Sequence, residues 1–123
     1  MKNLCLNCNN IVNHNAVKFC SVSCEKEYKY KSFIKLWLTN EIDGTTGVKV
    51  LKPSKYIYRW FKEQPQKCEI CGCSNIWNGK ILKLEVDHVN GDRSDSRKCN
   101  LRLLCPNCHS QTDTFRNTKR NYD

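Results

Sequence analysis

The spacing of apolar residues predicts a strand, a loop, a second strand and a helix in the last third of the chain. Residues 82–86 (LKLEV) alternate apolar and polar side chains, which is the period of a half-buried strand. Residues 90–98 (NGDRSDSRK) are turn-forming or charged and predict a loop. A second short strand is expected at 101–104 (LRLL). Pro106 suits the first turn of a helix, which we expect to run to about Phe115.

Two earlier segments have the apolar spacing of helices. Residues 25–39 form an amphipathic pattern that also carries many lysines, and Ser21 or Ser23 is available as its N-cap. Residues 55–64 predict a second helix, and residues 40–53, which contain DGTTG, are expected to form a flexible break between the two. The apolar positions of the first helix are Tyr30, Phe33, Ile34, Trp37 and Leu38, and those of the second are Ile57, Trp60 and Phe61.

An Asn-Gly pair lies between apolar residues in the segment 76–81 (IWNGKI). Asn-Gly is strongly preferred in two-residue turns between antiparallel strands, so this segment predicts a tight hairpin. We expect Trp77, inside the segment, to anchor the core rather than to stack on a nucleic-acid base.

Ten cysteines in a chain of 123 residues indicate disulfides or metal sites. The first set has the spacing CxxC, eleven residues, CxxxC, which can bind one tetrahedral zinc ion in a zinc-ribbon or treble-clef finger. Two disulfides are the alternative for this set, and His14 could replace one thiolate. The set consists of Cys5, Cys8, Cys20 and Cys24.

The second cysteine set joins the segment before the predicted strands to the start of the last helix. CxxC, 33 residues and another CxxC form a strong signature of a structural zinc ion bound by four thiolates. The sequence CPNCH is also an attachment pattern for c-type haem, but that attachment requires export, and no apolar export segment follows Met1. The set consists of Cys68, Cys71, Cys105 and Cys108, while Cys73 and Cys99 have no assigned role.

The charge balance suggests the kind of partner, and the absence of apolar segments suggests the compartment. The chain has 21 basic and 12 acidic residues, hence a formal charge of +9. Two four-cysteine zinc sites, each with a net charge of −2, lower this to about +5 (9 − 2 × 2), which still suits a nucleic-acid partner. Without a signal peptide or a long apolar run, we expect a cytoplasmic protein with no membrane partner. In that reducing compartment, paired CxxC motifs hold zinc more often than they form disulfides.

Four polar residues fall at the ends of the predicted elements in the last third of the chain. Asp87 and His88 end the first strand, and Asn100 begins the second. His109 lies in the first turn of the helix. A carboxylate and an imidazole can share a divalent ion, and an imidazole on the other face of the strand can take a proton from water. Asn100 can hold the loop or the imidazole by hydrogen bonding. Phosphodiester hydrolysis needs a metal ion on the phosphate, a base for water and rigid spacing between them.

The same residues resemble the motif of the HNH endonucleases, a family with a ββα-metal fold. DH at 87–88, the asparagine of NLRLLC at 100–105 and CPNCH at 105–109 match that motif in order. The resemblance runs from about Cys68 to Phe115. It implies an α+β protein with a small zinc-stabilised ββα-metal nuclease core, preceded by a zinc finger and helices. We expect an N-terminal four-cysteine zinc finger and basic helix at 1–39, a linker and second helix at 40–67, and the HNH nuclease domain with its structural zinc at 68–123.

The resemblance also implies roles for individual residues. His88 would be the general base, and Asp87 and His109 would bind the catalytic ion. Asn100 would be a catalytic-site residue, either structural or near that ion. Asp113, one turn after His109 in the predicted helix, is a further candidate ligand because some relatives have a ligand there.

By this resemblance, the chain is a metal-dependent DNA endonuclease of a phage or mobile element, acting in the cytoplasm of a bacterial host. It would use Mg²⁺, Mn²⁺ or another divalent ion, besides two structural zinc ions, and nick DNA or cut both strands as a monomer or homodimer. The alternatives are a zinc-dependent DNA-binding protein without cleavage activity and an RNA nuclease. Basic residues near the motif are candidate DNA contacts, namely Arg93, Arg97, Lys98, Arg102, Arg116, Lys119 and Arg120.

Overall fold

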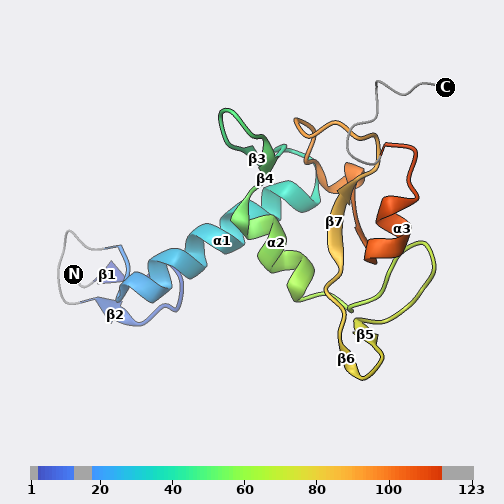
Figure 1. Cartoon of the computed structure of the whole chain (residues 1–123). Helices are drawn as coiled ribbons and strands as arrows, with labels where there is room; N and C mark the ends of the chain where they lie inside the picture. Colours follow the sequence, from blue (N-terminus) through green and yellow to red (C-terminus); the bar gives the residue numbers. More distant parts are fainter. Residues whose placement is uncertain (1–2, 13–17, 115–123) are drawn as a thin grey trace. The chain divides into compact units, whose positions relative to one another are not determined.

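The computed structural model describes residues 3–12 and 18–114 of the chain. It divides into two compact units, Met1–Leu36 and Trp37–Asp123. In the described part, three α-helices and four two-stranded antiparallel sheets make a mixed α and β protein (Figure 1). None of the helices in this part is long and apolar enough to cross a membrane.

The first unit contains a short hairpin and most of the long helix. Strands β1 (Asn3–Leu4) and β2 (Ile11–Val12) pair antiparallel, and α1 spans Val22–Leu38. The predicted N-cap Ser21 is confirmed, since its Oγ accepts a hydrogen bond from the backbone N–H of Cys24 at 3.2 Å. The helix therefore begins three residues before the predicted start.

The predicted apolar face of α1 is only partly correct. Tyr30 and Ile34 are buried, and Trp37 is fully buried. Leu38, predicted on the same face, is 42% exposed because it is the last residue of the helix.

The second unit begins with a hairpin and a capped helix. Strands β3 (Thr45–Thr46) and β4 (Lys52–Pro53) pair where a flexible break was expected. Helix α2 (Lys55–Lys62) starts at Ser54, whose Oγ accepts from the N–H of Tyr56. It ends two residues earlier than predicted.

An aromatic cluster forms part of the core of the second unit. The ring of Trp37 meets the rings of Trp60 and Phe61 edge-on, at centroid distances of 5.3 and 6.1 Å. Such tilted pairs add favourable electrostatics to burial. Ile57 is fully buried on the same helix as Trp60 and Phe61.

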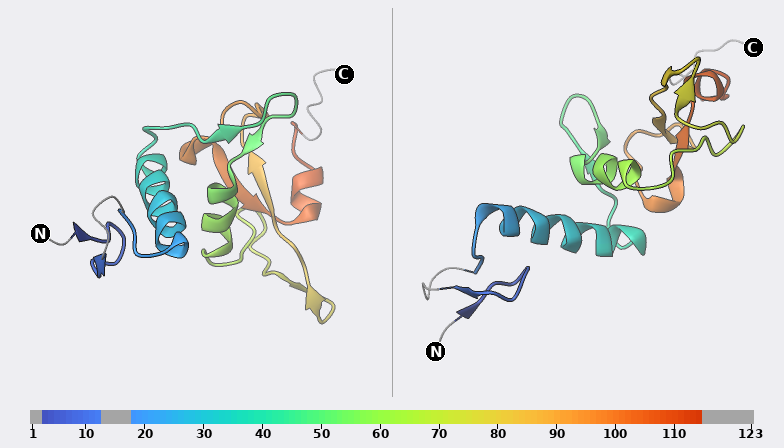
Figure 2. Two further views of the ribbon diagram at one scale, coloured as in Figure 1. Left: turned by 90° about the vertical axis from the view of Figure 1, so that its left-hand side faces the viewer. Right: turned by 90° about the horizontal axis from the view of Figure 1, so that it is seen from below.

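The two predicted strands pair as an antiparallel ribbon, although the first begins at Glu85, three residues later than predicted. Strand β7 (Glu85–His88) pairs with β8 (Leu101–Leu104), so that Asp87 lies opposite Arg102 and His88 opposite Leu101. A 3₁₀ turn, η1 (Lys98–Asn100), leads into β8. In both figures α2 and α3 lie on either side of β7 (Figures 1 and 2).

Helix α3 (Pro106–Ser110) starts at the predicted proline but is shorter than predicted. It ends five residues before Phe115, and the chain turns at residues 111–114. The predicted helical spacing between His109 and Asp113 is therefore wrong.

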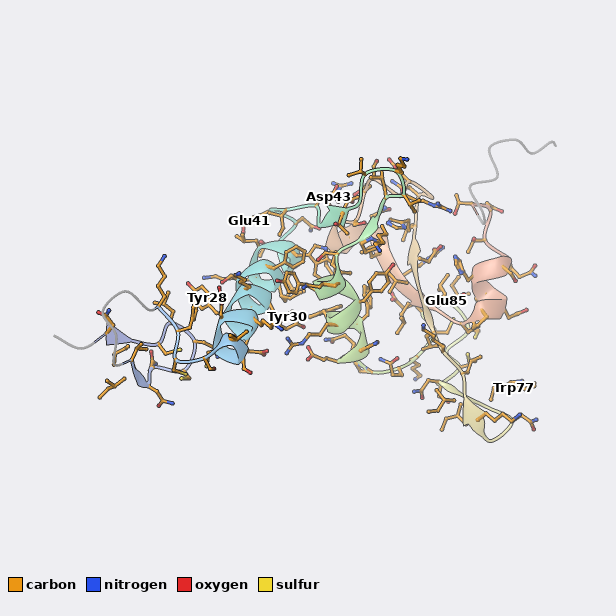
Figure 3. All side chains as sticks on the ribbon, turned by 60° about the vertical axis from the view of Figure 1, so that its left-hand side comes forward. Tyr28, Tyr30, Glu41, Asp43, Trp77 and Glu85 are labelled. Carbon is orange, nitrogen blue, oxygen red and sulfur yellow. The ribbon has the colours of Figure 1, made fainter. Side chains whose placement is uncertain are left out.

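The predicted Asn-Gly hairpin is confirmed, but its tryptophan does not anchor the core. Strands β5 (Ile76–Trp77) and β6 (Lys80–Ile81) pair through Asn78 and Gly79, which both have positive φ. Trp77 is 63% exposed and lies at the end of the projecting hairpin (Figure 3). A two-stranded hairpin has no inner layer of its own, so burial of the tryptophan would need another element across it.

Candidate active site

The four sulfur atoms of each cysteine set lie within 4.8 Å of one another. In the first set, the Sγ atom of Cys20 is 3.6 Å from that of Cys8 and 3.5 Å from that of Cys24. In the second set, the Sγ atoms of Cys71 and Cys105 are 3.8 Å apart. A tetrahedral zinc ion with Zn–S bonds of about 2.3 Å holds its sulfurs about 3.8 Å apart. Both sets could therefore hold structural zinc.

All ten cysteines lie in the described part of the chain, and each is a free thiol. The disulfide alternative is therefore not found for the first set. The other alternative, that His14 replaces a thiolate, falls outside the described residues.

Cys5 and Cys68 occupy equivalent places, as the buried first cysteine of a CxxC pair. Burial alone raises the pKa of both thiols, but hydrogen bonds from backbone N–H groups outweigh it and leave each pKa at about 6. The main donors are Cys8 for the first thiol and Cys105 for the second. Because the thiolate is the form that binds zinc, these backbone hydrogen bonds favour the metal-binding form of one cysteine in each set.

The second cysteine set controls the start of α3. Cys105 caps the helix, since its Sγ accepts from the N–H of Cys108 at 3.4 Å. The N–H of His109 donates to the carbonyl of Cys105 at 2.9 Å. The residue that follows the last cysteine is therefore held in a defined helical turn.

Asp87 and His109 meet across the ribbon and the helix. Oδ1 of Asp87 lies 3.4 Å from Nε2 of His109, and Oδ2 of Asp87 accepts from Nε of Arg102 at 2.9 Å. Asp87 is only 6% exposed. The Arg102 contact thus orients the buried carboxylate so that its other oxygen faces the imidazole.

Glu85 holds the far side of the same imidazole. Its Oε1 lies 2.8 Å from Nδ1 of His109, and Glu85 lies between β7 and α3 (Figure 3). Glu85 and Asp87 are two residues apart on β7, so their side chains share one face of the strand. Carboxylates that bind the second nitrogen of a metal-ligating histidine orient the ring and select its tautomer. Nothing in the sequence pattern distinguished Glu85 from any other exposed acidic residue.

The donor set of Asp87 and His109 fits a divalent ion. A carboxylate oxygen and an imidazole nitrogen, each bound at about 2.1 Å at right angles, are about 3 Å apart. The observed 3.4 Å is close to that separation. Two protein ligands leave positions for water and phosphate oxygens, as is usual for Mg²⁺.

His88 is held from a different direction. Its Nε2 lies 3.0 Å from Oγ of Ser96, a residue with no exposed surface. Burial lowers the pKa of the His88 imidazole below its ordinary value, and the neighbouring carboxylates oppose this only in part. The neutral imidazole, which can accept a proton, is therefore favoured near pH 7.

Asn100 organises the loop between β7 and β8. Its Nδ2 donates to Oδ1 of Asn90 at 2.9 Å and to the carbonyl of Asp95 at 2.7 Å. Its Oδ1 accepts from the backbone N–H of Asn90 at 3.1 Å. The side chain thus ties both ends of the loop together, which is one of the roles considered for it.

Asp87, His88 and His109 line one hollow with a volume of about 360 Å³, which we call the catalytic hollow. Arg93 and Tyr58 line it as well. Asp113 instead lines a different hollow, together with Cys108 and Arg102. The structure therefore gathers the three main candidates and leaves Asp113 apart from them.

The candidate DNA contacts have different surroundings. Arg97 forms an ion pair with Asp95 at 2.8 Å, and Lys98 lies over the ring of Trp60, 5.4 Å from its centroid. Arg102 bonds to Asp87, so Arg93 is the described candidate that lines the catalytic hollow. The remaining three candidates, Arg116, Lys119 and Arg120, lie outside the described residues.

Comparison with known proteins identifies a curated relative. Over 51 residues, 42% of its length, the chain is 45% identical to the H-N-H endonuclease F-TflIV of Escherichia phage T5. It spans about a fifth (22%) of the length of that protein. No protein-family model and no solved structure matches the chain. Over part of its length, the chain is thus a homologue of a phage H-N-H endonuclease.

Proposed function

We propose that this chain is a metal-dependent DNA endonuclease of the HNH type, with a ββα-metal core and two structural zinc sites. The observation that carries the proposal is the convergence of Asp87, His88 and His109 on one hollow, with 3.4 Å between the first and the last. Similarity to a phage enzyme over part of the chain supports the same reaction and a phage or mobile-element origin.

His88 acts as the general base that takes a proton from the attacking water. A neutral imidazole has one N–H and one lone pair. If Nε2–H donates to Oγ of Ser96, Nδ1 keeps the lone pair and is the atom that accepts the proton. Burial keeps the ring neutral near pH 7, in agreement with this role.

Asp87 and His109 would hold a divalent ion, with Arg102 and Glu85 orienting these two ligands. When bound, such an ion supplies positive charge to the phosphate and to the leaving oxygen. Arg93, in the same hollow, adds a side chain that can position the phosphate. One such site cuts one strand at a time, so a monomer nicks duplex DNA, and a dimer or a second visit breaks both strands.

Incubation of the purified protein with supercoiled plasmid tests the proposal. We expect nicked or linear DNA with Mg²⁺ or Mn²⁺ and none with EDTA. His88→Ala, purified in parallel, controls for contaminating nuclease. Binding of the plasmid without cleavage under every metal condition would instead identify a zinc-dependent DNA-binding protein. Cleavage of RNA but not of DNA would change the substrate class.

A further inference from the structure

A second hollow adjoins the catalytic hollow. It has a volume of about 440 Å³ and lies beside α2 and β7. Tyr58, Val86 and His109 line both hollows, so the two are neighbours on one continuous surface of the second unit. Because Lys62 and Lys83 line this second hollow, we call it the lysine hollow.

Lys62 and Lys83 supply the positive charge of the lysine hollow. Both are exposed, and within the described part of the chain neither forms an ion pair. The acidic residue of the hollow, Glu85, bonds to His109. Gln66, also in its lining, donates to backbone carbonyls, among them that of Phe61 at 2.9 Å. The two exposed ammonium groups therefore remain available to bind an anion.

We propose that the lysine hollow is a binding site for the DNA backbone, which holds a phosphate next to the one cleaved in the catalytic hollow. This rests on the proposed function, because it assigns the path of the same substrate. Lys62 and Lys83 bind the phosphate as point charges, which supplies affinity without sequence preference. DNA bound there extends from the catalytic hollow towards α2.

Tyr58 lines both hollows, so the proposed path of the DNA backbone passes this residue. Its side chain is 40% exposed, and burial of the rest raises the pKa of its hydroxyl above the ordinary value. The hydroxyl therefore stays protonated near pH 7, and it can donate a hydrogen bond to a phosphate oxygen. A negative phenolate at this position would repel the backbone.

The double variant Lys62→Gln/Lys83→Gln tests the site, with Lys80→Gln as a matched control. Lys80 is an exposed lysine on β6 of the same unit, and it does not line the lysine hollow. The probe is a duplex DNA oligonucleotide of mixed sequence, and its Kd is measured over a range of salt in buffer without added divalent ions. The slope of log Kd against log salt concentration reports the number of phosphate contacts. We expect this slope to correspond to about two fewer contacts in the double variant and to stay unchanged in the control.

Cleavage kinetics separate a phosphate contact from a structural effect. The double variant should raise KM and leave kcat within about twofold, because binding through these lysines is the same in the ground and transition states. Zinc content should match the wild type. An unchanged salt slope, an equal fall in the Lys80→Gln control, or a loss in kcat with constant KM would overturn the lysine site.

The binding assay needs no cleavage, so the two proposals can fail separately. If the wild type never cuts DNA but loses two phosphate contacts in the double variant, the endonuclease proposal fails and the lysine site stands. If the wild type cuts DNA and the slopes are equal, the endonuclease stands and the lysine site fails.

Discussion

Ser96 connects three parts of the second unit at the level of single atoms. Its Oγ meets Nε2 of His88, its carbonyl accepts from Nε1 of Trp37 at 2.7 Å, and its N–H donates to Oδ1 of Asp43 at 2.8 Å. The loop that carries Ser96 was expected to be merely charged and turn-forming. The position of the proposed base therefore depends on a buried serine that no motif identified.

Ser96→Ala should slow cleavage by about fivefold. The change removes one hydrogen bond to the imidazole, and such bonds contribute about 0.5–1.5 kcal/mol. It leaves the proposed ion ligands, the lysines and the cysteines in place. Single-turnover rates at saturating DNA measure the loss. A rate equal to the wild type in a folded variant would show that the serine does not orient the base.

His88→Ala should lose about 10²–10⁴-fold in cleavage rate, the usual contribution of a general base, while DNA affinity and zinc content remain. Asp87→Ala and His109→Ala should instead raise the concentration of Mg²⁺ or Mn²⁺ needed for cleavage. Excess metal should partly restore cleavage by Asp87→Ala and His109→Ala, but not cleavage by His88→Ala. Metal titrations of all three variants distinguish the roles, and near wild-type cleavage by His88→Ala would remove it as the base.

The pH–rate profile should have its acid limb below pH 6.5. Burial lowers the pKa of His88, so the folded protein keeps the neutral imidazole at lower pH than a free histidine does. Protonation removes the lone pair, and the rate therefore falls as pH falls through this lowered pKa. Cleavage rates measured from pH 5.5 to 8 at constant ionic strength test the direction of this pKa shift. A limb centred above pH 7 would contradict it.

At the scale of elements, two short pieces of backbone carry the residues of the proposed active site. The ribbon β7–β8 supplies Asp87 and His88, and the five-residue helix α3 supplies His109. The second cysteine set links α3 to the segment at Cys68 and Cys71. The proposed zinc ion would thus hold the helix where the ribbon needs it.

The purified chain should contain two zinc ions, one for each cysteine set. Cys105→Ser should reduce this to one and abolish cleavage, because it removes a zinc ligand from the set that joins α3 to Cys68 and Cys71. Cys99→Ser is the matched control, because Cys99 is exposed and lies outside both sets. This variant should keep two zinc ions. Elemental analysis of the three proteins gives the counts. Wild-type protein free of zinc and rich in disulfides would refute the metal sites.

The sequence predicted those elements whose signals are local. The Asn78-Gly79 turn, the cap at Ser21 and the strand 101–104 depend on neighbouring residues, and all three are confirmed. The end of α3 and the exposure of Trp77 depend on what packs against them, which periodicity does not contain.

Site residues divide in the same way. The motif brought together Asp87, His88 and His109, and the structure gathers them on one hollow. Glu85 and Ser96 gave no signal because each acquires its role only when a second segment folds against it. The sequence motif therefore identifies the proposed base and ion ligands, but not the residues that orient their side chains.

At the scale of the whole molecule, the first unit is separate from the proposed chemistry. The boundary lies within α1, between Leu36 and Trp37. Every residue of the catalytic hollow and of the lysine hollow belongs to the second unit. Since no described residue of the first unit lines either hollow, we predict that this unit adds DNA affinity rather than chemistry.

Removal of residues 1–24 should therefore weaken DNA binding and lower its salt dependence, while some cleavage persists at high enzyme concentration. This truncation keeps Trp37, whose indole N–H supports Ser96. Binding isotherms at several salt concentrations provide the measurement, with circular dichroism as the check on folding. A folded truncated protein that binds DNA as tightly as the full chain would make the first unit a structural cap.

If the second cysteine set binds zinc as proposed, the shortness of α3 makes zinc supply a step in the maturation of the protein. An isolated helix of five residues does not persist in water. His109 would therefore reach its position beside Asp87 only when zinc binds the second cysteine set. A chain made where zinc is scarce would carry all its reactive side chains and still be inert. A later rise in zinc would then activate the existing pool without new synthesis. For the proposed endonuclease, this would separate the time of production from the time of action.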